Sequence, residues 1–404
     1  MNHEERIAIK VSRMRNSLTL GLKTLKEERE AAGLPVFDFG LGETKGELAK
    51  VISEAGQAAF RDGHTQYPTP AGMPELRQAV LRWLNLEQEY TIDNVVISTG
   101  AKQCLFNIFL AVCNPGDHIL LESAPWVSYE PLAVSATASP VLVIPRENDN
   151  LLVSVTDLER NLRRRPHSRM FLVNNPCNPT AQLYDEAHIN ALLEVCAQYG
   201  VYMVLDRLYW KIMFDGRKYP EPIVNERTKP WLIQVDGLSK NWRRTGGLRI
   251  GWSVAPTDVS DAMTKIQSHY TSGAAMPTQY AALAALNSPY DYEMARDLEK
   301  KRNLLMEHMK DMPHVNIWPT PATFYSFWDC EPVFGKTTPE GQVIANSTDL
   351  SNYLAQRAGV ITASGEGFFQ NGYLRWSFAT SDEDIINGMK ATRELCESPE
   401  RPVP

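Results

Sequence analysis

The amino-acid sequence predicts an α/β protein, in which a mostly parallel sheet covered by helices on both faces is joined to a smaller α+β domain. Short apolar runs alternate with amphipathic helical segments between residues 95 and 254. The apolar runs are continuous, which is typical of parallel strands buried on both faces. After about residue 285, a charged helical stretch and alternating strands replace this pattern, and 404 residues are enough for two domains.

Residues 1–45 form an N-terminal arm in this prediction. The arm begins with a stretch rich in Lys, Arg, Glu and Leu that ends at Gly33-Leu34-Pro35, a sequence typical of a helix stop. The loop after residue 63 contains two prolines and a glycine and therefore cannot be helical. The elements expected before residue 95 are helical segments at 4–32, 47–61 and 73–84, a strand at 36–39, a glycine turn at 40–42 and the loop at 64–72.

Residues 46–285 form the predicted large domain, which carries the sheet. Its expected strands are residues 95–98, 118–121, 141–144, 170–173, 201–205, 231–235 and 250–254, with helices at 101–112 and 185–199. Residues 286–404 form the predicted smaller α+β domain, which the N-terminal arm joins. Its expected elements are a helical stretch at 291–311, strands at 324–327 and 373–378, and a last helix that opens with the capping-box-like sequence at 381–384.

Composition and charge argue against several classes of protein. A net charge of −7 disfavours a general nucleic-acid binder. The six cysteines are scattered, with no CxxC pair and no accompanying histidines, so we expect no metal site, no disulfide framework and a reducing compartment. No apolar run approaches the roughly 20 residues of a membrane span, and no secretory signal is visible. We therefore expect a cytoplasmic protein.

Lys240 is the residue around which the predicted chemistry is organised. It follows an apolar strand, in a glycine-rich loop with three arginines, at the edge of the sheet where open α/β folds bind ligands. Partial burial and neighbouring cations lower the pKa of a lysine from about 10.4 by up to roughly 3–5 units. The neutral amine is then a nucleophile suited to Schiff-base chemistry. A solvated basic loop is the alternative interpretation.

The ends of other predicted strands supply candidate partners for this lysine. The strand-to-helix turn at 99–102 offers free N–H groups and the positive end of a helix dipole to an anion. Asp206 ends a buried strand and needs a partner, such as the protonated ring nitrogen of a cofactor, Arg207 or a loop cation. Arg249 is suited to a forked contact with a phosphate.

Three further features have both a functional and a structural interpretation. The asparagine-rich turn at 174–180 either reaches a ligand or caps the strand, and capping is favoured by the residues alone. Arg375 lies in an otherwise apolar strand and needs an anion, which is either a substrate carboxylate or a structural Asp or Glu. Trp126 either stacks on a flat ring or belongs to the core.

In combination, these motifs resemble those of the class I and II aminotransferases, fold-type I enzymes that depend on pyridoxal 5′-phosphate (PLP) and include the aspartate and aromatic aminotransferases. The resemblance runs from about residue 37 to residue 378. Its motifs are YPTPAG at 67–72, PELR at 74–77, TGAKQ at 99–103, NPCNPT at 175–180, Asp206 with Tyr209, Ser239-Lys240, RIGW at 249–252 and LRWSF at 374–378. The resemblance implies a mostly parallel seven-stranded sheet in the large domain and a homodimer with shared active sites.

The resemblance also implies a role for each matching residue. Lys240 would carry PLP as an aldimine and then move the α-proton of the substrate, with Asp206 and Tyr209 as the other catalytic residues. Asp206 would keep the pyridine nitrogen protonated. The implied PLP-binding residues are Tyr67 from the neighbouring subunit, Gly100, Ala101, Lys102, Trp126, Asn178, Asp206, Tyr209, Ser239, Lys240 and Arg249. The implied substrate-binding residues are Gly42, Trp126, Asn178 and Arg375, and no metal is implied.

Several positions depart from the pattern of the family, and none of them is Lys240, Asp206 or Arg375. The interval from Lys240 to Arg249 is 249 − 240 = 9 positions, one longer than usual. The substitutions are Arg207 for an acidic residue, Ala181 for a glycine, Gly237 for a serine, and Ala322-Thr323 for Gly-Ala.

The predicted function is transfer of an amino group from an L-amino acid to a 2-oxo acid by a ping-pong route. The departures leave open a PLP enzyme of specialised amino-acid metabolism that does not transaminate, such as a lyase, cyclase or oxidase. A PLP-binding or regulatory protein without turnover is the third hypothesis. The sequence does not rank an acidic substrate side chain, favoured by Arg207, Arg243 and Arg244, against an aromatic or guanidinium side chain, favoured by Trp126, Trp210, Trp242 and Tyr209.

Overall fold

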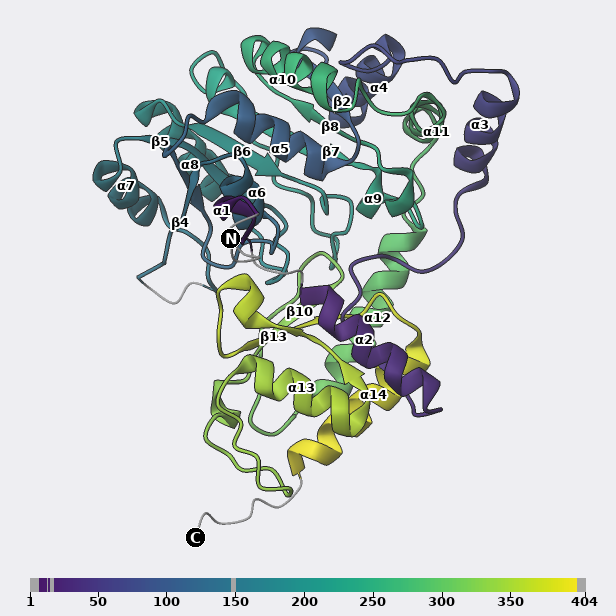
Figure 1. The fold of residues 1–404 in the computed structure, drawn as a ribbon, viewed down its shortest axis with the longest axis vertical. Helices are drawn as coiled ribbons and strands as arrows, with labels where there is room; N and C mark the ends of the chain where they lie inside the picture. The colour runs from purple at the N-terminus through teal and green to yellow at the C-terminus, as the bar shows by residue number, and fades with distance from the viewer. Residues whose placement is uncertain (1–6, 13, 15–17, 147–149, 398–404) are drawn as a thin grey trace.

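The computed structural model of the chain describes residues 7–12, 14, 18–146 and 150–397, and two sheets organise them (Figure 1). The larger sheet has seven strands in the spatial order β2-β8-β7-β6-β5-β3-β4. These strands are β2 (Val95–Ser98), β8 (Gly251–Val254), β7 (Leu232–Gly237), β6 (Tyr202–Asp206), β5 (Ser168–Asn174), β3 (His118–Leu121) and β4 (Ser139–Leu142).

The larger sheet is mostly parallel, as the sequence predicted. The pairs from β7 to β4 all run parallel, whereas β8 runs antiparallel to both of its neighbours, β2 and β7. One predicted strand is displaced, because the apolar run at 141–144 suggested a later start than the observed one. β4 begins at Ser139, and Pro140 pairs with Ile119 of β3. Proline is tolerated there because β4 is an edge strand.

Successive residues of each strand point to opposite faces of the larger sheet. Both faces are therefore apolar, and helices cover both. Val96 packs among the helices of one face, and Val95 and Ile97 pack among those of the other. The helices of the first group are α5 (Ala101–Val112), α6 (Tyr129–Ser135) and α10 (Thr257–Tyr270). The other helices around this sheet are α3 (Lys50–Arg61), α4 (Pro74–Leu84), α7 (Val155–Arg164), α8 (Glu186–Tyr199) and α11 (Met276–Asn287).

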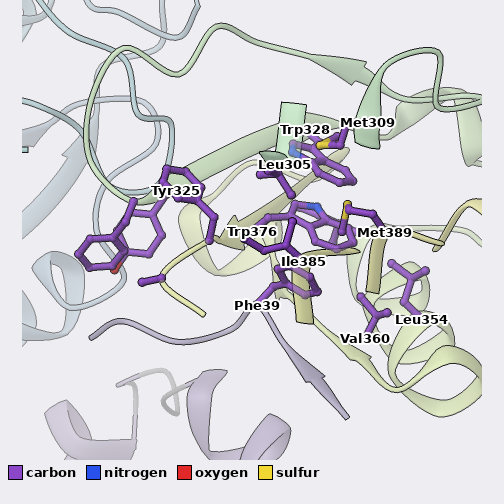
Figure 2. Packing of buried hydrophobic residues seen from close by; sticks show 14 of the residues in the cluster. Phe39, Leu305, Met309, Tyr325, Trp328, Leu354, Val360, Trp376, Ile385 and Met389 are labelled. Carbon is purple, nitrogen blue, oxygen red and sulfur yellow. The ribbon is translucent and has the colours of Figure 1, made fainter. Parts of the chain in front are cut away.

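The smaller sheet has four antiparallel strands in the order β12-β13-β10-β9. Its core contains Trp328 of β10 stacked on Trp376 of β13, with ring centroids 3.9 Å apart (Figure 2). Its elements are β9 (Asn316–Ile317), β10 (Tyr325–Asp329), β12 (Ala363–Ser364), β13 (Tyr373–Ser377), α12 (Glu293–Met309), α13 (Ser347–Ala358) and α14 (Asp382–Glu397).

The N-terminal arm reaches the core beside this smaller sheet. β1 (Phe37–Asp38) pairs in parallel with β11 (Val360–Ile361), and the buried ring of Phe39 meets Trp376 edge-on at 5.2 Å (Figure 2). The stretch expected to be helical at 4–32 holds two separate helices, α1 (Ile9–Ser12) and α2 (Leu18–Ala31), and part of it lies outside the described residues. The domain boundaries at residues 45 and 285 stay predictions.

Several observed elements were not identified in the sequence, among them α7, α10, α11, α13 and the short strands β9, β11 and β12. The 3₁₀ helices are Ile92–Asn94, Lys229–Trp231, Gly246–Leu248, Glu331–Val333 and Gly365–Phe368. None of the helices in the described ranges is both long and apolar enough to cross a lipid bilayer.

Candidate active site

A cavity of about 450 Å³ lies at the edge of the larger sheet where β5 and β6 end, and Tyr325 and Arg375 of the smaller sheet also line it. The carboxyl ends of parallel strands are the usual place for ligands in open α/β sheets. The structure brings eleven of the predicted site residues to this cavity. They are Gly42, Ala101, Lys102, Trp126, Asn178, Asp206, Tyr209, Ser239, Lys240, Arg249 and Arg375.

Lys240 lies in the cavity, so the solvated basic loop is the wrong interpretation. It belongs to the one-turn helix α9 (Leu238–Asn241), which follows β7 directly. Its Nζ donates a hydrogen bond to the carbonyl oxygen of Gly42. Burial lowers the pKa of the Lys240 amine to about 8, with Glu43 acting in the opposite direction and Arg375 and Arg249 lowering the pKa further. A useful fraction of this amine is therefore neutral near neutral pH.

The turn that carries Lys240 is held from behind by buried side chains. Asn241 Nδ2 donates to Asp236 Oδ1 at 2.9 Å, and Tyr290 OH donates to the Asn241 carbonyl at 2.8 Å. The other carboxylate oxygen of Asp236 accepts from the indole N–H of Trp210 at 3.0 Å. These hydrogen bonds form a chain from Trp210 through Asp236 and Asn241 to Tyr290, and the chain fixes the backbone next to Lys240.

Asp206 presents a buried carboxylate that has no cation within ion-pair distance among the described side chains. Oδ2 accepts from Tyr129 OH at 2.8 Å, and Oδ1 accepts from the Leu208 N–H at 3.2 Å. Burial raises the pKa of this carboxyl to about 6, although the hydrogen bond from Tyr129 opposes the rise. A cation placed in the cavity beside Asp206 would restore full ionisation. The suggested pairing with Arg207 is wrong, because that side chain binds Glu221.

Asn178 and Tyr209 form a second polar group in the cavity. Asn178 Nδ2 donates to Tyr209 OH at 3.2 Å, and the Tyr325 hydroxyl lies 3.4 Å from the same oxygen. Burial raises the pKa of the Tyr209 phenol well above its usual range, so it stays protonated and able to donate. In the same turn Asn174 Oδ1 accepts from the Asn178 N–H. The turn at 174–180 is thus partly a structural cap and partly a wall of the cavity.

An anion-binding cradle lies where β2 turns into α5. The N–H groups of Ala101 and Lys102, at the start of that helix, have no protein acceptor in the described structure. Gly100 has φ +84°, a backbone conformation that favours glycine, and a Cβ at this position would lie 2.5 Å from Arg249 Nη2 and displace the guanidinium. Ser239 lines the same part of the cavity, and free N–H groups at a helix start are the chemistry that suits an anion.

Arg375 is 5% exposed and has no carboxylate partner in the described chain. Nη1 donates to Asn178 Oδ1 at 3.0 Å, Nη2 donates to the Gly40 carbonyl at 3.1 Å, and Nε has no partner. The guanidinium lies 4.4 Å from the ring centroid of Tyr325 and 5.2 Å from that of Phe368. A structural Asp or Glu is therefore not what offsets its charge, and an anionic ligand fits the site.

Trp126 is half-buried, packs against the core beside Tyr129 and also lines the cavity. The Nζ atom of Lys102 lies 4.9 Å from the centre of its ring. Burial and the nearby Arg249 lower the pKa of Lys102, which is exposed and has no carboxylate within ion-pair distance in the described part of the chain. Trp126 and Lys102 thus present an aromatic surface with a cation over it.

Tyr67 and several proposed specificity residues lie away from the cavity. Tyr67 is 90% exposed and lines a separate groove of about 800 Å³, which Arg249 also borders. Five other residues considered for contact with the substrate side chain also lie outside the lining of the cavity. Arg207 is fully buried between Trp210 and Tyr219, and Arg243 pairs with Asp297. Arg244 is exposed. Trp210 and Trp242 pack around Trp83.

Two of the unusual residues have a local explanation in the backbone. A Cβ at Gly237 would lie 3.0 Å from both the Gly251 Cα and the Ile250 carbonyl, so a serine would be crowded there. Ala181 takes the left-handed conformation with φ +58°, which costs an alanine about 1 kcal/mol more than a glycine. Gly237 thus fits the close packing at the edge of the sheet. Ala181 is strained, and the buried turn around it tolerates the strain.

Sequence reasoning missed two tyrosines of the site. Tyr129 binds Asp206, and Tyr325 lies against Arg375 and Tyr209. Tyr129 stands in no motif identified in the sequence. Tyr325 ends the sequence Ala322-Thr323-Phe324-Tyr325, which was noted only for its departures from the family. They reach the cavity from α6 and from the smaller sheet. Only the three-dimensional packing brings them to residues more than 70 positions away in the chain.

Comparisons with known proteins agree on one family. The family model described as aminotransferase class I and II matches residues 35–391. A probable aspartate/prephenate aminotransferase of Rickettsia felis is 32% identical over 398 residues, which are 97% of each chain. The aspartate aminotransferase of Rhizobium meliloti is 30% identical and covers 94% of this chain and 93% of its own.

Solved structures agree with this result. The crystal structure of the aspartate aminotransferase of Rhizobium meliloti superimposes with a TM-score of 0.91 at 29% identity, covering 97% of this chain and 98% of that one. The aspartate aminotransferase of Thermus thermophilus with maleate gives a TM-score of 0.87 at 26% identity, covering 96% and 99%.

Proposed function

Since this chain belongs to the class I and II aminotransferases, which transfer amino groups with the help of PLP, we propose that its cavity takes an L-amino acid with a carboxylate side chain, aspartate first. The enzyme moves the amino group of its donor to a 2-oxo acid in two half-reactions of ping-pong type. The single observation that carries the choice of substrate is the presence in one cavity of two cations, Arg375 and Lys102, that no described carboxylate neutralises.

The residues present fit PLP. The cradle of Ala101, Lys102, Ser239 and Arg249 offers two backbone N–H groups and Arg249 Nη2 to a phosphate, while Arg249 Nη1 donates to the Gly246 carbonyl. The buried carboxylate of Asp206 lacks a cation, which a protonated pyridine nitrogen supplies. When bound, PLP supplies an aldehyde on an electron-withdrawing ring that accepts the amino group and stabilises charge at the α-carbon.

Each group of this chain then has a task that its surroundings support. The Lys240 amine, neutral in part near pH 8, holds the cofactor and afterwards takes and returns the proton on the α-carbon of the substrate. Asp206 keeps a proton on the ring nitrogen. Tyr209 and Asn178 donate to the ring oxygen, and Arg375 holds the α-carboxylate in a forked contact.

The preference for a second carboxylate follows from the charges that remain. Of the four cations around the cavity, Lys240 is used covalently and Arg249 faces the phosphate cradle. Arg375 and Lys102 remain, and a dicarboxylic amino acid offers one carboxylate to each. Glu43 also lines the cavity and repels such a ligand. The net attraction for a dicarboxylic amino acid is therefore weaker than the number of cations alone suggests.

We expect L-aspartate alone to remove the visible absorption of the PLP-loaded protein, and an added 2-oxo acid to restore it. The reason is that each half-reaction requires only one of the two substrates. Absorbance of the cofactor and mass spectrometry of the product are the measurements. Release of ammonia or peroxide without a need for a 2-oxo acid would instead establish a PLP enzyme that does not transaminate.

A substitution of Lys102 provides the control for the choice of donor. Lys102→Met keeps an unbranched side chain one atom shorter and removes its charge, so it should lower kcat/KM for aspartate about tenfold relative to that for alanine. An unchanged ratio would show that the side-chain carboxylate is bound elsewhere or is not required.

Loading of the cofactor should depend on pH through Lys240. Its pKa of about 8 means that the amine is protonated and unreactive at lower pH and neutral at higher pH. The rate at which PLP attaches to the apoprotein should therefore rise about tenfold per pH unit up to about pH 7 and level off above about pH 9. Stopped-flow absorbance measures this rate, and a rise that continues to about pH 10 would mean that burial does not perturb the amine.

We also propose a homodimer in the cytoplasm. The exposed ring of Tyr67 and the adjacent groove bordered by Arg249 support a second copy of the chain at this surface, with Tyr67 directed to the phosphate of that copy. Phe60, 67% exposed, lines the same groove.

A further inference from the structure

Residues 40–46, which we call the cavity segment, are held by three cations from two parts of the chain, Arg375 in β13 and Lys240 and Arg243 in one loop. Arg375 Nη2 donates to the Gly40 carbonyl at 3.1 Å, and Lys240 Nζ donates to the Gly42 carbonyl. Farther along, Arg243 Nη1 donates to the Lys45 carbonyl at 3.0 Å. The first two cations belong to the cavity, and the third lies outside it.

Arg243 contacts more than the backbone of the cavity segment. Its Nη2 lies 3.1 Å from Asp297 Oδ2 on α12, the helix that leads into the smaller sheet (Figure 1). Its side chain also packs on Gly46, since a Cβ there would lie 2.8 Å from Arg243 Cδ, and Gly46 has φ +121°. The Arg243 guanidinium therefore contacts both the cavity segment and α12, and it links them to the loop that follows Lys240.

The far end of the cavity segment is fastened as well. Lys45 Nζ donates to Thr380 Oγ1 at 3.0 Å and lies 3.6 Å from Asp384 Oδ2. Lys301 donates to the Thr380 carbonyl at 2.7 Å. The cations and carboxylates of this cluster pair with each other one to one, as Lys45 with Asp384, Arg243 with Asp297 and Lys301 with Asp382. The cluster is therefore a joint between chain segments and has no surplus charge for a ligand.

We propose that Arg243 is a positioning residue for amino transfer, which holds the cavity segment where Gly40 and Gly42 meet the substrate. The inference rests on the proposed function, because it takes Arg375 and Lys240 as the groups that engage the substrate. The carbonyls of Gly40 and Gly42 accept hydrogen bonds from those two cations. In the PLP-loaded protein Lys240 is bonded to the cofactor, so the place of the segment determines chiefly how Arg375 is directed before substrate arrives.

The next residue in the chain, Arg244, offers a matched comparison. It carries the same charge in the same loop, but it is exposed and no ion pair or hydrogen bond of its side chain is found in the described structure. If net charge near the cavity were the relevant property, the two arginines would act alike. If the contacts to Lys45 and Asp297 matter, only Arg243 acts.

We would compare Arg243→Gln and Arg244→Gln in the PLP-loaded protein. Hydrogen exchange of the backbone amides in residues 40–46 should become about fivefold faster in Arg243→Gln and stay unchanged in Arg244→Gln. KM for the amino donor should rise by a similar factor in Arg243→Gln, whereas kcat and the visible absorption of the cofactor should change little. Asp297→Asn, which leaves Arg243 in place, should give a smaller effect in the same direction.

Equal exchange in the two arginine variants would overturn the proposal. Faster exchange in Arg243→Gln without a rise in KM would also overturn it, because Arg243 would then be structural only. Failure of the proposed function gives a different result. A wild-type protein that transaminates no donor would refute that function, while the exchange comparison would still decide whether Arg243 holds the cavity segment.

Discussion

Replacement of Lys240 by alanine is expected to abolish the visible absorption of the PLP-loaded protein and to lower kcat by at least about 10⁴-fold. Lys240 is the amine of the cavity whose pKa is lowered to about 8, and it projects from a turn that Asn241, Asp236 and Tyr290 fix from behind. Its removal takes away both the covalent attachment of the cofactor and the group that moves the α-proton. Absorbance spectra and steady-state kinetics measure the two effects.

Lys265→Ala is the control for this substitution. Lys265 is exposed on α10, on the surface of the protein, and does not line the cavity. This variant should keep the wild-type spectrum and rate. A Lys240→Ala protein that still shows the visible absorption would place the covalent bond on another lysine, of which Lys102 is the one that also lines the cavity.

Asp206→Asn should lower kcat/KM by about 10²–10³-fold while PLP remains bound. The substitution removes one charge of a buried pair that forms when the ring nitrogen is protonated, and loss of one partner of such a pair costs about 3–5 kcal/mol. Asn also accepts only one of the two hydrogen bonds, from Tyr129 and from the Leu208 N–H, that the carboxylate oxygens accept. Kinetics and the pH dependence of the cofactor spectrum report the loss.

Asp236→Asn is the matched comparison for Asp206→Asn. Asp236 is also fully buried near the end of a neighbouring strand, and burial raises its pKa to about 6 as well, but it does not line the cavity. Because Asp236 helps to fix the turn of Lys240, its loss should lower the melting temperature and also kcat/KM, but it should leave the pH dependence of the cofactor spectrum unchanged. An equal change of that pH dependence in the two variants would mean that Asp206 does not act on the cofactor directly.

Much of the architecture could be predicted because it follows from local patterns. The alternation of apolar strands and amphipathic helices indicated the parallel sheet, and the turns after those strands contained the site residues. Lys240, Asp206 and Asn178 all follow buried strands, and the carboxyl ends of parallel strands meet at one edge. The reversal of β8 was not visible, because a buried strand looks the same in either direction.

The residues that the sequence misjudged depend on contacts across the fold. Arg207 directly follows Asp206, yet successive residues point to opposite sides of the sheet, so its guanidinium lies between Trp210 and Tyr219 and away from the cavity. Arg243 and Arg244 look equivalent in the sequence, and only the approach of Gly46 and Asp297 distinguishes them. Tyr129 gave no signal at all, because its partner Asp206 is 77 positions away.

The most direct test of the account is to reduce the PLP-loaded protein with borohydride, digest it and map the peptide that carries the cofactor. Reduction makes the bond between the cofactor and its lysine permanent. The geometry of the cavity predicts label on Lys240 alone, in the peptide that contains Ser239 and Asn241. Label on any other lysine, or a protein that takes up no cofactor and stays colourless, would contradict the assignment of the site.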